Sequence, residues 1–100
     1  MLPNHLTPVE TQSLLASRFK TLRLVAGYKR ATLARKTGVS ESSLKRFETS
    51  GEISLKSLLR LSHGLNKLQE FSSLFEPPEA ETLAELKEKS EKHIPKRGKF

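Results

Sequence analysis

Residues 30–48 read RATLARKTGVSESSLKRFE, and the pattern of this stretch is the clearest indication of the fold. Its first part has a small apolar side at helical spacing, and Gly38 is a typical stop for such a helix. Ser40 is a good N-cap for a second helix, in which Leu44 and Phe47 are spaced to face inward. Because only three residues separate them, the stretch predicts two short helices joined by a tight turn.

The segment before this stretch predicts a longer helix. Residues 7–10, Thr-Pro-Val-Glu, combine an N-cap, a proline at the first helical position and a glutamate three residues after the cap. Gly27 follows as the expected stop. The apolar spacing predicts a buried face made of Leu15, Phe19, Leu22 and Ala26.

Two further helices are predicted after the stretch. Ser54 is the expected N-cap of the fourth, which ends at Gly64, and Asn66 is the expected cap of the fifth. No segment alternates with the period of a strand, so the fold class is all-α. The apolar residues expected to be buried are Leu55, Leu58, Leu59 and Leu61 in the fourth helix and Leu68, Phe71, Leu74 and Phe75 in the fifth.

The chain divides into a leader, one domain and a tail. We expect a loose leader over 1–6 and a compact domain over 7–76, because the diproline at 77–78 cannot continue a helix. We expect the tail over 77–100 to be polar and partly disordered, with four apolar residues before a basic end. It is expected to be dispensable for folding but needed for full function.

Composition excludes several classes of protein. With no Cys, the chain has no disulfide framework and no thiolate zinc site. No segment approaches the ~20 apolar residues of a membrane span, and no signal peptide is expected, so a cytoplasmic, nucleoid-associated location is predicted. The three histidines lack metal-ligand spacing, and no nucleophile or acid pair is evident. We therefore expect neither a cofactor or metal nor an enzyme.

Positive charge gathers in the middle of the chain. Residues 18–60 contain eleven Lys and Arg against three Glu, so this segment has a net charge of +8. The rest of the chain has a net charge of −1, which gives +7 for the whole chain. Such a segment favours a polyanion partner, either nucleic acid or an acidic membrane surface, although scattered solvated charges would look the same. The tight turn adds helix-turn-helix geometry, which projects the second helix toward a DNA major groove. An ordinary helical hairpin with a polar face remains an alternative.

The residues from Ser17 to Leu61 resemble the Cro/C1-type (XRE) helix-turn-helix family. The match is carried by Arg23 in the first helix, then Gly27, Leu33-Ala34, Gly38-Val39-Ser40, Leu44 and Phe47-Glu48 at the spacing of the family pattern. The resemblance implies a five-helix, lambda-repressor-like domain that binds palindromic double-stranded DNA as a homodimer and represses transcription. A membrane-surface role is the weakest alternative, because the basic residues surround the groove-reading helix and show no Trp-rich apolar face.

The resemblance also implies a role for individual residues. Arg23 and Glu48 fall where the family has a buried structural ion pair, and Arg46 is the strongest base-reading candidate because its guanidinium matches guanine O6 and N7. Arg30 replaces the usual Gln. The base-reading set is Glu41, Ser42, Ser43 and Arg46; the phosphate set is Lys29, Arg30, Ser40, Lys45 and Lys56; and the dimer interface is Leu68, Phe71, Leu74 and Phe75.

A narrower resemblance covers residues 47–78, where the loop is one residue shorter than in most of the family. This part looks like the HipB-type autorepressors encoded beside HipA-like kinase toxins. The implied function is autoregulation of a toxin–antitoxin operon, with a HipA-like kinase as partner. Two alternatives stay open: a phage-type repressor without a toxin, and a protein-interaction module that mainly cages a kinase.

Overall fold

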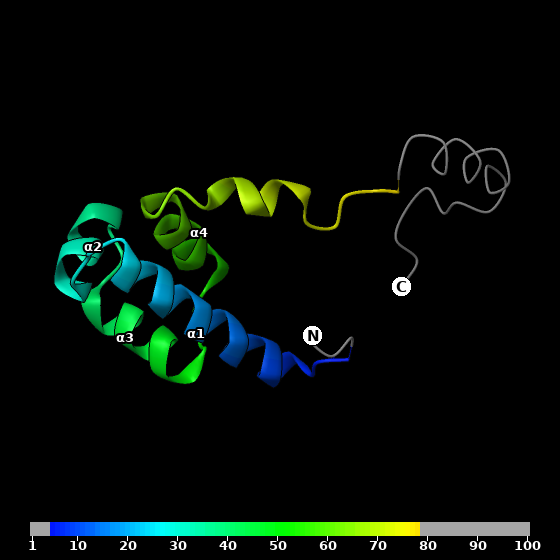
Figure 1. Cartoon of the computed structure of the whole chain (residues 1–100), viewed down its shortest axis with the longest axis horizontal. Coiled ribbons are helices and arrows are strands. Elements are labelled where there is room, and N and C mark those ends of the chain that lie inside the picture. The colour runs from blue at the N-terminus through cyan, green and yellow to red at the C-terminus, as the bar shows by residue number, and fades with distance from the viewer. Residues whose placement is uncertain (1–4, 79–100) are drawn as a thin grey trace, which may run out of the picture.

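The computed structural model describes residues 5–78, and within that range all regular structure is helical (Figure 1). The all-α prediction is therefore confirmed for this part of the chain. The predicted tail lies almost entirely outside it, as do four of the six predicted leader residues. The helices are α1 Pro8–Val25, α2 Arg30–Thr37, α3 Glu41–Ser50, α4 Leu55–Gly64 and the 3-10 helix η1 Leu68–Ser73.

The helix starts follow the capping chemistry of the sequence. The Thr7 side chain accepts a hydrogen bond from the Glu10 backbone N–H at 3.1 Å, and the Glu10 carboxylate accepts one from the Thr7 N–H at 2.9 Å. This reciprocal pair satisfies two backbone donors that the first turn cannot pair internally. Ser40 and Ser54 cap α3 and α4 with a single hydrogen bond each, accepting from the N–H three residues on at 3.1 Å.

The turn between α2 and α3 depends on a glycine. Gly38 has φ +78°, a left-handed conformation that is unfavourable for any residue with a Cβ atom. Its N–H donates to the Ala34 carbonyl at 2.9 Å and closes α2. Val39 then turns into the core at 4% exposure, which leaves Ser40 outside to start α3.

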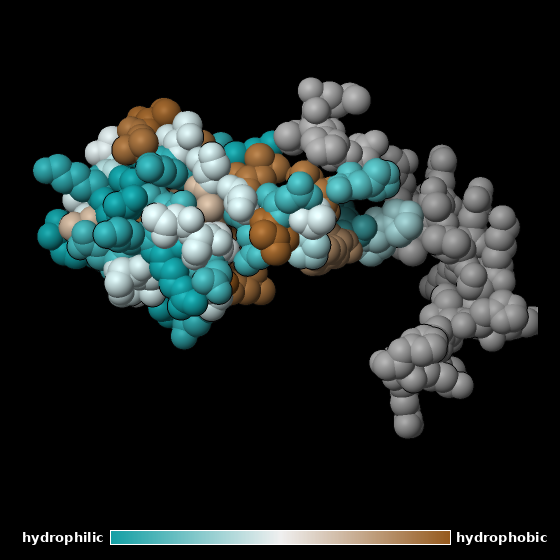
Figure 2. Space-filling view, turned by 90° about the horizontal axis from the view of Figure 1, so that it is seen from below, coloured by the Kyte–Doolittle hydropathy of each residue, from teal (hydrophilic) through white to brown (hydrophobic). Residues whose placement is uncertain are grey.

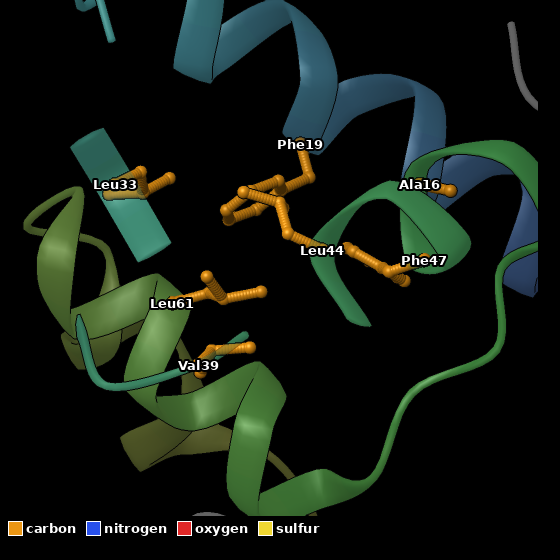
Figure 3. Packing of buried hydrophobic residues seen from close by; sticks show 7 residues of the cluster. All are labelled: Ala16, Phe19, Leu33, Val39, Leu44, Phe47 and Leu61. Carbon is orange, nitrogen blue, oxygen red and sulfur yellow. The ribbon is translucent and has the colours of Figure 1, made fainter. Parts of the chain in front are cut away.

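The core lies where α1, α2, α3 and α4 meet (Figure 3). Helix α1 packs on α3, α2 packs on both α3 and α4, and η1 contacts α4. Phe19 and Phe47 meet edge to face with ring centroids 5.5 Å apart, a favoured aromatic geometry. The buried cluster consists of Ala16, Phe19, Leu33, Val39, Leu44, Phe47 and Leu61.

The predicted buried face of α1 was wrong except at Phe19. Leu15 and Leu22 are 43% and 36% exposed, and the buried positions are instead Ala16, Phe19 and Arg23. Ala26 is exposed as well. The buried face is rotated toward Arg23 because a carboxylate from α3 meets that guanidinium inside the domain.

The end of α4 also differs from the prediction. Asn66 does not cap a fifth helix; it has φ +59°, and it ends α4. Its N–H donates to His63 O and the Lys67 N–H donates to Ser62 O, the pair of hydrogen bonds of a Schellman motif. Gly64 stays helical and lies against α2, where a Cβ would come within 2.5 Å of Thr37 Cγ2.

The predicted burial in the last two helices holds in part. Leu61 is fully buried and Leu58 and Leu59 are half-buried, but Leu55, in the first turn of α4, is 66% exposed. The fifth helix is a short 3-10 helix that stops at Ser73. Leu74 and Phe75 therefore lie beyond it in non-helical backbone.

Candidate nucleic-acid interface

Helix α3 is buried along one side only. Leu44 and Phe47 are 0% and 2% exposed, and they fix the helix against α1 and α2. The end of the molecule formed by α2 and α3 is mainly hydrophilic in the view that faces α3 (Figure 2). The exposed residues of α3 are Glu41, Ser42, Ser43, Lys45, Arg46, Thr49 and Ser50, which include all four predicted base-reading residues.

Hydroxyl groups cluster at the start of α3. Ser40 Oγ lies 2.8 Å from Ser43 Oγ and 3.3 Å from Ser42 Oγ, and it also accepts the Ser43 N–H as the helix cap. Hydroxyls rotate freely and can both donate and accept, so this cluster can adapt to a base edge or to a phosphate. Ser40, predicted to contact phosphate, is thus primarily a cap in the free protein.

Arg46 is one of the two exposed cations of α3, beside Lys45. Its Nη2 lies 3.1 Å from Oε1 of Glu52, in the loop after α3, and its side chain remains 67% exposed. Glu52 was missed by the sequence interpretation. It lies six residues after Arg46 and across a turn, a spacing that no helical pattern signals. A shallow groove runs beside this pair, lined by Ser43, Arg46, Glu52, Ile53, Ser54 and Ser57. The groove lies between α3 and the start of α4.

The predicted phosphate-contacting residues divide into two groups. Lys29, Lys45 and Lys56 are exposed, at the start of α2, in the middle of α3 and in the first turn of α4. Arg30 is different: its side chain is 28% exposed, and its Nε donates to Glu48 Oε1 at 2.9 Å. A second structural contact therefore occupies the position where only a phosphate contact was expected.

The structure brings Arg23 and Glu48 together inside the domain. Arg23 Nε and Nη2 donate to the two oxygens of Glu48 at 2.6 and 2.9 Å, a bidentate geometry. The two side chains are 6% and 0% exposed. Arg23 Nη1 also donates to the Tyr28 carbonyl at 2.8 Å. With Arg30 as its third donor, Glu48 ties α3 to both α1 and α2.

These contacts set the protonation of Glu48. Burial raises the pKa of the Glu48 carboxyl, but the hydrogen bonds from Arg23 and Arg30 and their positive charges lower it more. The net pKa lies below the ordinary value of a glutamate. Glu48 is therefore ionised at neutral pH.

The predicted dimer residues lie at the end of the described chain. Phe75 is 98% exposed, Leu74 54% and Leu68 37%, whereas Phe71 is half-buried.

Within residues 5–78, no helix is both long and apolar enough to cross a membrane. The same residues hold no group of three His, Asp or Glu side chains that could bind a metal ion.

Comparison with known proteins links the chain to a protein family. No curated protein and no solved structure matches the chain. A family model described as helix-turn-helix matches residues 19–71, which span the last part of α1, all of α2, α3 and α4, and part of η1. The matched region contains the exposed α3 surface and the buried Arg23–Glu48 pair. The chain belongs to the helix-turn-helix family of DNA-binding transcription regulators.

Proposed function

We propose that this protein is a repressor that binds a palindromic DNA operator as a homodimer. The observation that carries the proposal is α3, which is buried on one side through Leu44, Phe47 and the Glu48 side chain and turns a polar surface containing Arg46 to solvent. A helix presented in this way fits a major groove about 12 Å wide. Repression follows when the bound protein occupies a promoter.

The proposal assigns two kinds of DNA contact. Arg46 and the first-turn residues Glu41, Ser42 and Ser43 read base edges, because they are exposed on one short helix. Lys29, Lys45 and Lys56 contact phosphates. The start of α2 supports this assignment, since it has no side-chain cap and its free N–H groups can meet an anion.

The homodimer is proposed from exposed apolar surface. Leu74 and Phe75 follow η1 and are largely exposed, and a second copy can cover them. One recognition helix reads few base pairs, whereas two related by a two-fold axis read two half-sites about 34 Å apart. The interface would consist of Leu68, Phe71, Leu74 and Phe75.

We also propose a genetic context, an operon that encodes a HipA-like kinase toxin. The resemblance of residues 47–78 to HipB-type autorepressors supports it. A phage-type repressor without a toxin is the alternative, and the neighbouring gene distinguishes them. The rival in another class, a module that mainly cages a kinase, differs in salt dependence: DNA binding weakens steeply with salt because phosphate contacts release counterions.

The test of DNA binding starts by selecting duplexes from a randomised pool with the wild-type protein. Affinity for the selected duplex and for a scrambled one is then measured by fluorescence anisotropy over a salt series. Arg46→Ala should reduce the preference for the selected duplex by about 1–3 kcal/mol per lost bidentate contact. Arg60→Ala is the matched control, because it removes the same charge from α4, outside α3. A preference that survives in Arg46→Ala refutes the assignment.

A further inference from the structure

The contact between Arg46 and Glu52 leaves part of the guanidinium free. Nε and Nη2 of Arg46 both point to one oxygen, Glu52 Oε1, at 3.4 and 3.1 Å. These two groups form the side edge of the guanidinium. The end edge, Nη1 with the second N–H of Nη2, donates to nothing within residues 5–78 and faces solvent with the 67% exposed side chain.

Glu52 itself is held in place by the loop that carries it. Its N–H donates to Ser50 Oγ at 3.3 Å, and that hydroxyl donates to the Arg46 carbonyl at 2.7 Å. Gly51 makes the turn with φ +80°, packed so closely on α1 that a Cβ would lie 2.9 Å from Gln12 Cβ. Gln12 Nε2 also donates to the Gly51 carbonyl at 3.2 Å. The loop that carries the Glu52 carboxylate is therefore held against α1.

An arginine held by its side edge is suited to reading guanine. Guanine presents O6 and N7 in the major groove, and the end edge of a guanidinium supplies two parallel donors that match them. A free arginine has many rotamers and can turn to a phosphate, a contact that carries no sequence information. Holding Arg46 toward the groove disfavours that second use.

We propose that Glu52 is a specificity-determining residue that positions Arg46 for base reading. This inference rests on the proposed function. Glu52 is expected to have two opposite effects. Its negative charge weakens binding to all DNA through repulsion by phosphates. Its ion pair with Arg46 increases the difference in affinity between the preferred base and other bases. Removal of Glu52 should raise affinity in general and lower discrimination.

The experiment compares base preferences of full-length variants selected from a randomised duplex pool. Glu52→Gln removes the charge and keeps the shape of the side chain. Glu70→Gln is the matched control, because it removes the same charge from η1, which contacts α4 and not α3. Arg46→Ala and the double variant complete the set. Urea unfolding of each variant establishes that it is folded, which is expected because both side chains of the pair are mostly exposed.

Arg46→Ala first identifies the positions that Arg46 reads, as those whose preference it flattens. At these positions Glu52→Gln should weaken the preference by about two- to fivefold, the range of an exposed ion pair. Its affinity for scrambled duplex should rise, while Glu70→Gln keeps the wild-type preference. In the Arg46→Ala background, Glu52→Gln should change preference no further.

Two results overturn the inference. If the wild type discriminates and Glu52→Gln discriminates equally well at the Arg46 positions, the ion pair with Glu52 does not determine base preference. If Glu52→Gln changes preference to the same extent without Arg46, it contacts DNA by itself. A wild type that selects no sequence is a separate outcome, because it refutes the proposed DNA-reading function together with this inference.

Discussion

Replacement of Glu48 by leucine should destabilise this domain more than any other single change to its ion pairs. The Glu48 side chain is fully buried and accepts three hydrogen bonds, two from Arg23 and one from Arg30. Leucine fills the space but accepts nothing. The Arg23 guanidinium, 6% exposed, would then be buried with only the Tyr28 carbonyl as a partner.

The magnitude follows from the burial of each partner. Removing one member of a buried ion pair costs about 3–5 kcal/mol, because the other charge is left uncompensated. Arg23→Met should cost somewhat less, since Arg30 still donates to Glu48. Arg30→Met should cost only about 1 kcal/mol, because Arg30 is partly exposed and Glu48 keeps its bidentate partner. A domain of this size has a total stability of about 4–11 kcal/mol, so Glu48→Leu removes a large part of it.

Urea unfolding followed by circular dichroism measures these losses. The matched control is Glu52→Leu, which breaks an exposed ion pair and should cost less than about 1 kcal/mol. The double variant Arg23→Met with Glu48→Leu should lose clearly less than the sum of its single variants, because the only charge left without its partner is that of Arg30, which is partly exposed. If Glu48→Leu melts like Glu52→Leu, or if the two single losses simply add, the buried pair does not stabilise the domain as argued.

Three further outcomes are expected. The pKa of Glu48 is lowered in the folded state, so the stabilising effect of its carboxylate is complete above the unfolded pKa and is lost as pH falls through the folded pKa. At pH values below about 4.5, the urea midpoint of the wild type should therefore fall more steeply with pH than that of Glu48→Gln. Phe75→Asp should raise the dissociation constant of the proposed dimer by about tenfold or more in sedimentation equilibrium, since it places a charge in the proposed apolar interface, whereas Leu24→Asp on α1 should not. A chain that ends at Pro78 should keep its urea midpoint but lose DNA or partner affinity; a lowered midpoint, or affinities that do not change, would contradict the predicted role of the tail.

The sequence predicts the parts of the fold that depend on local chemistry. Thr7, Ser40 and Ser54 cap the helices as expected, because an N-cap needs only a side chain and the N–H three residues on. Gly38 gives the turn for an equally local reason. Spacing and resemblance also place the four α-helices correctly.

What the sequence could not predict depends on distant partners. The α1 face was misassigned because periodicity alone counts Arg23 as outward; only the family resemblance paired it with Glu48, which lies 25 residues away. Asn66 looked like an N-cap, but the hydrogen bonds of the preceding helix decide its role. Glu52 reaches Arg46 only through the turn at Gly51, which in turn depends on Gln12 of α1.

The ion pairs also determine which charges remain for DNA. Three arginines of the basic segment, Arg23, Arg30 and Arg46, meet carboxylates, so phosphate neutralisation would fall mainly to exposed cations outside these ion pairs, such as Lys45. Lys45→Ala should therefore lower the slope of log affinity against log salt by about one per protomer and weaken all sequences equally. Arg30→Met should change the slope less than Lys45→Ala, because its Nε is used by Glu48. Equal slopes for the two variants would mean that Arg30 contacts phosphate as fully as a free cation, and that the Glu48 contact gives way in the complex.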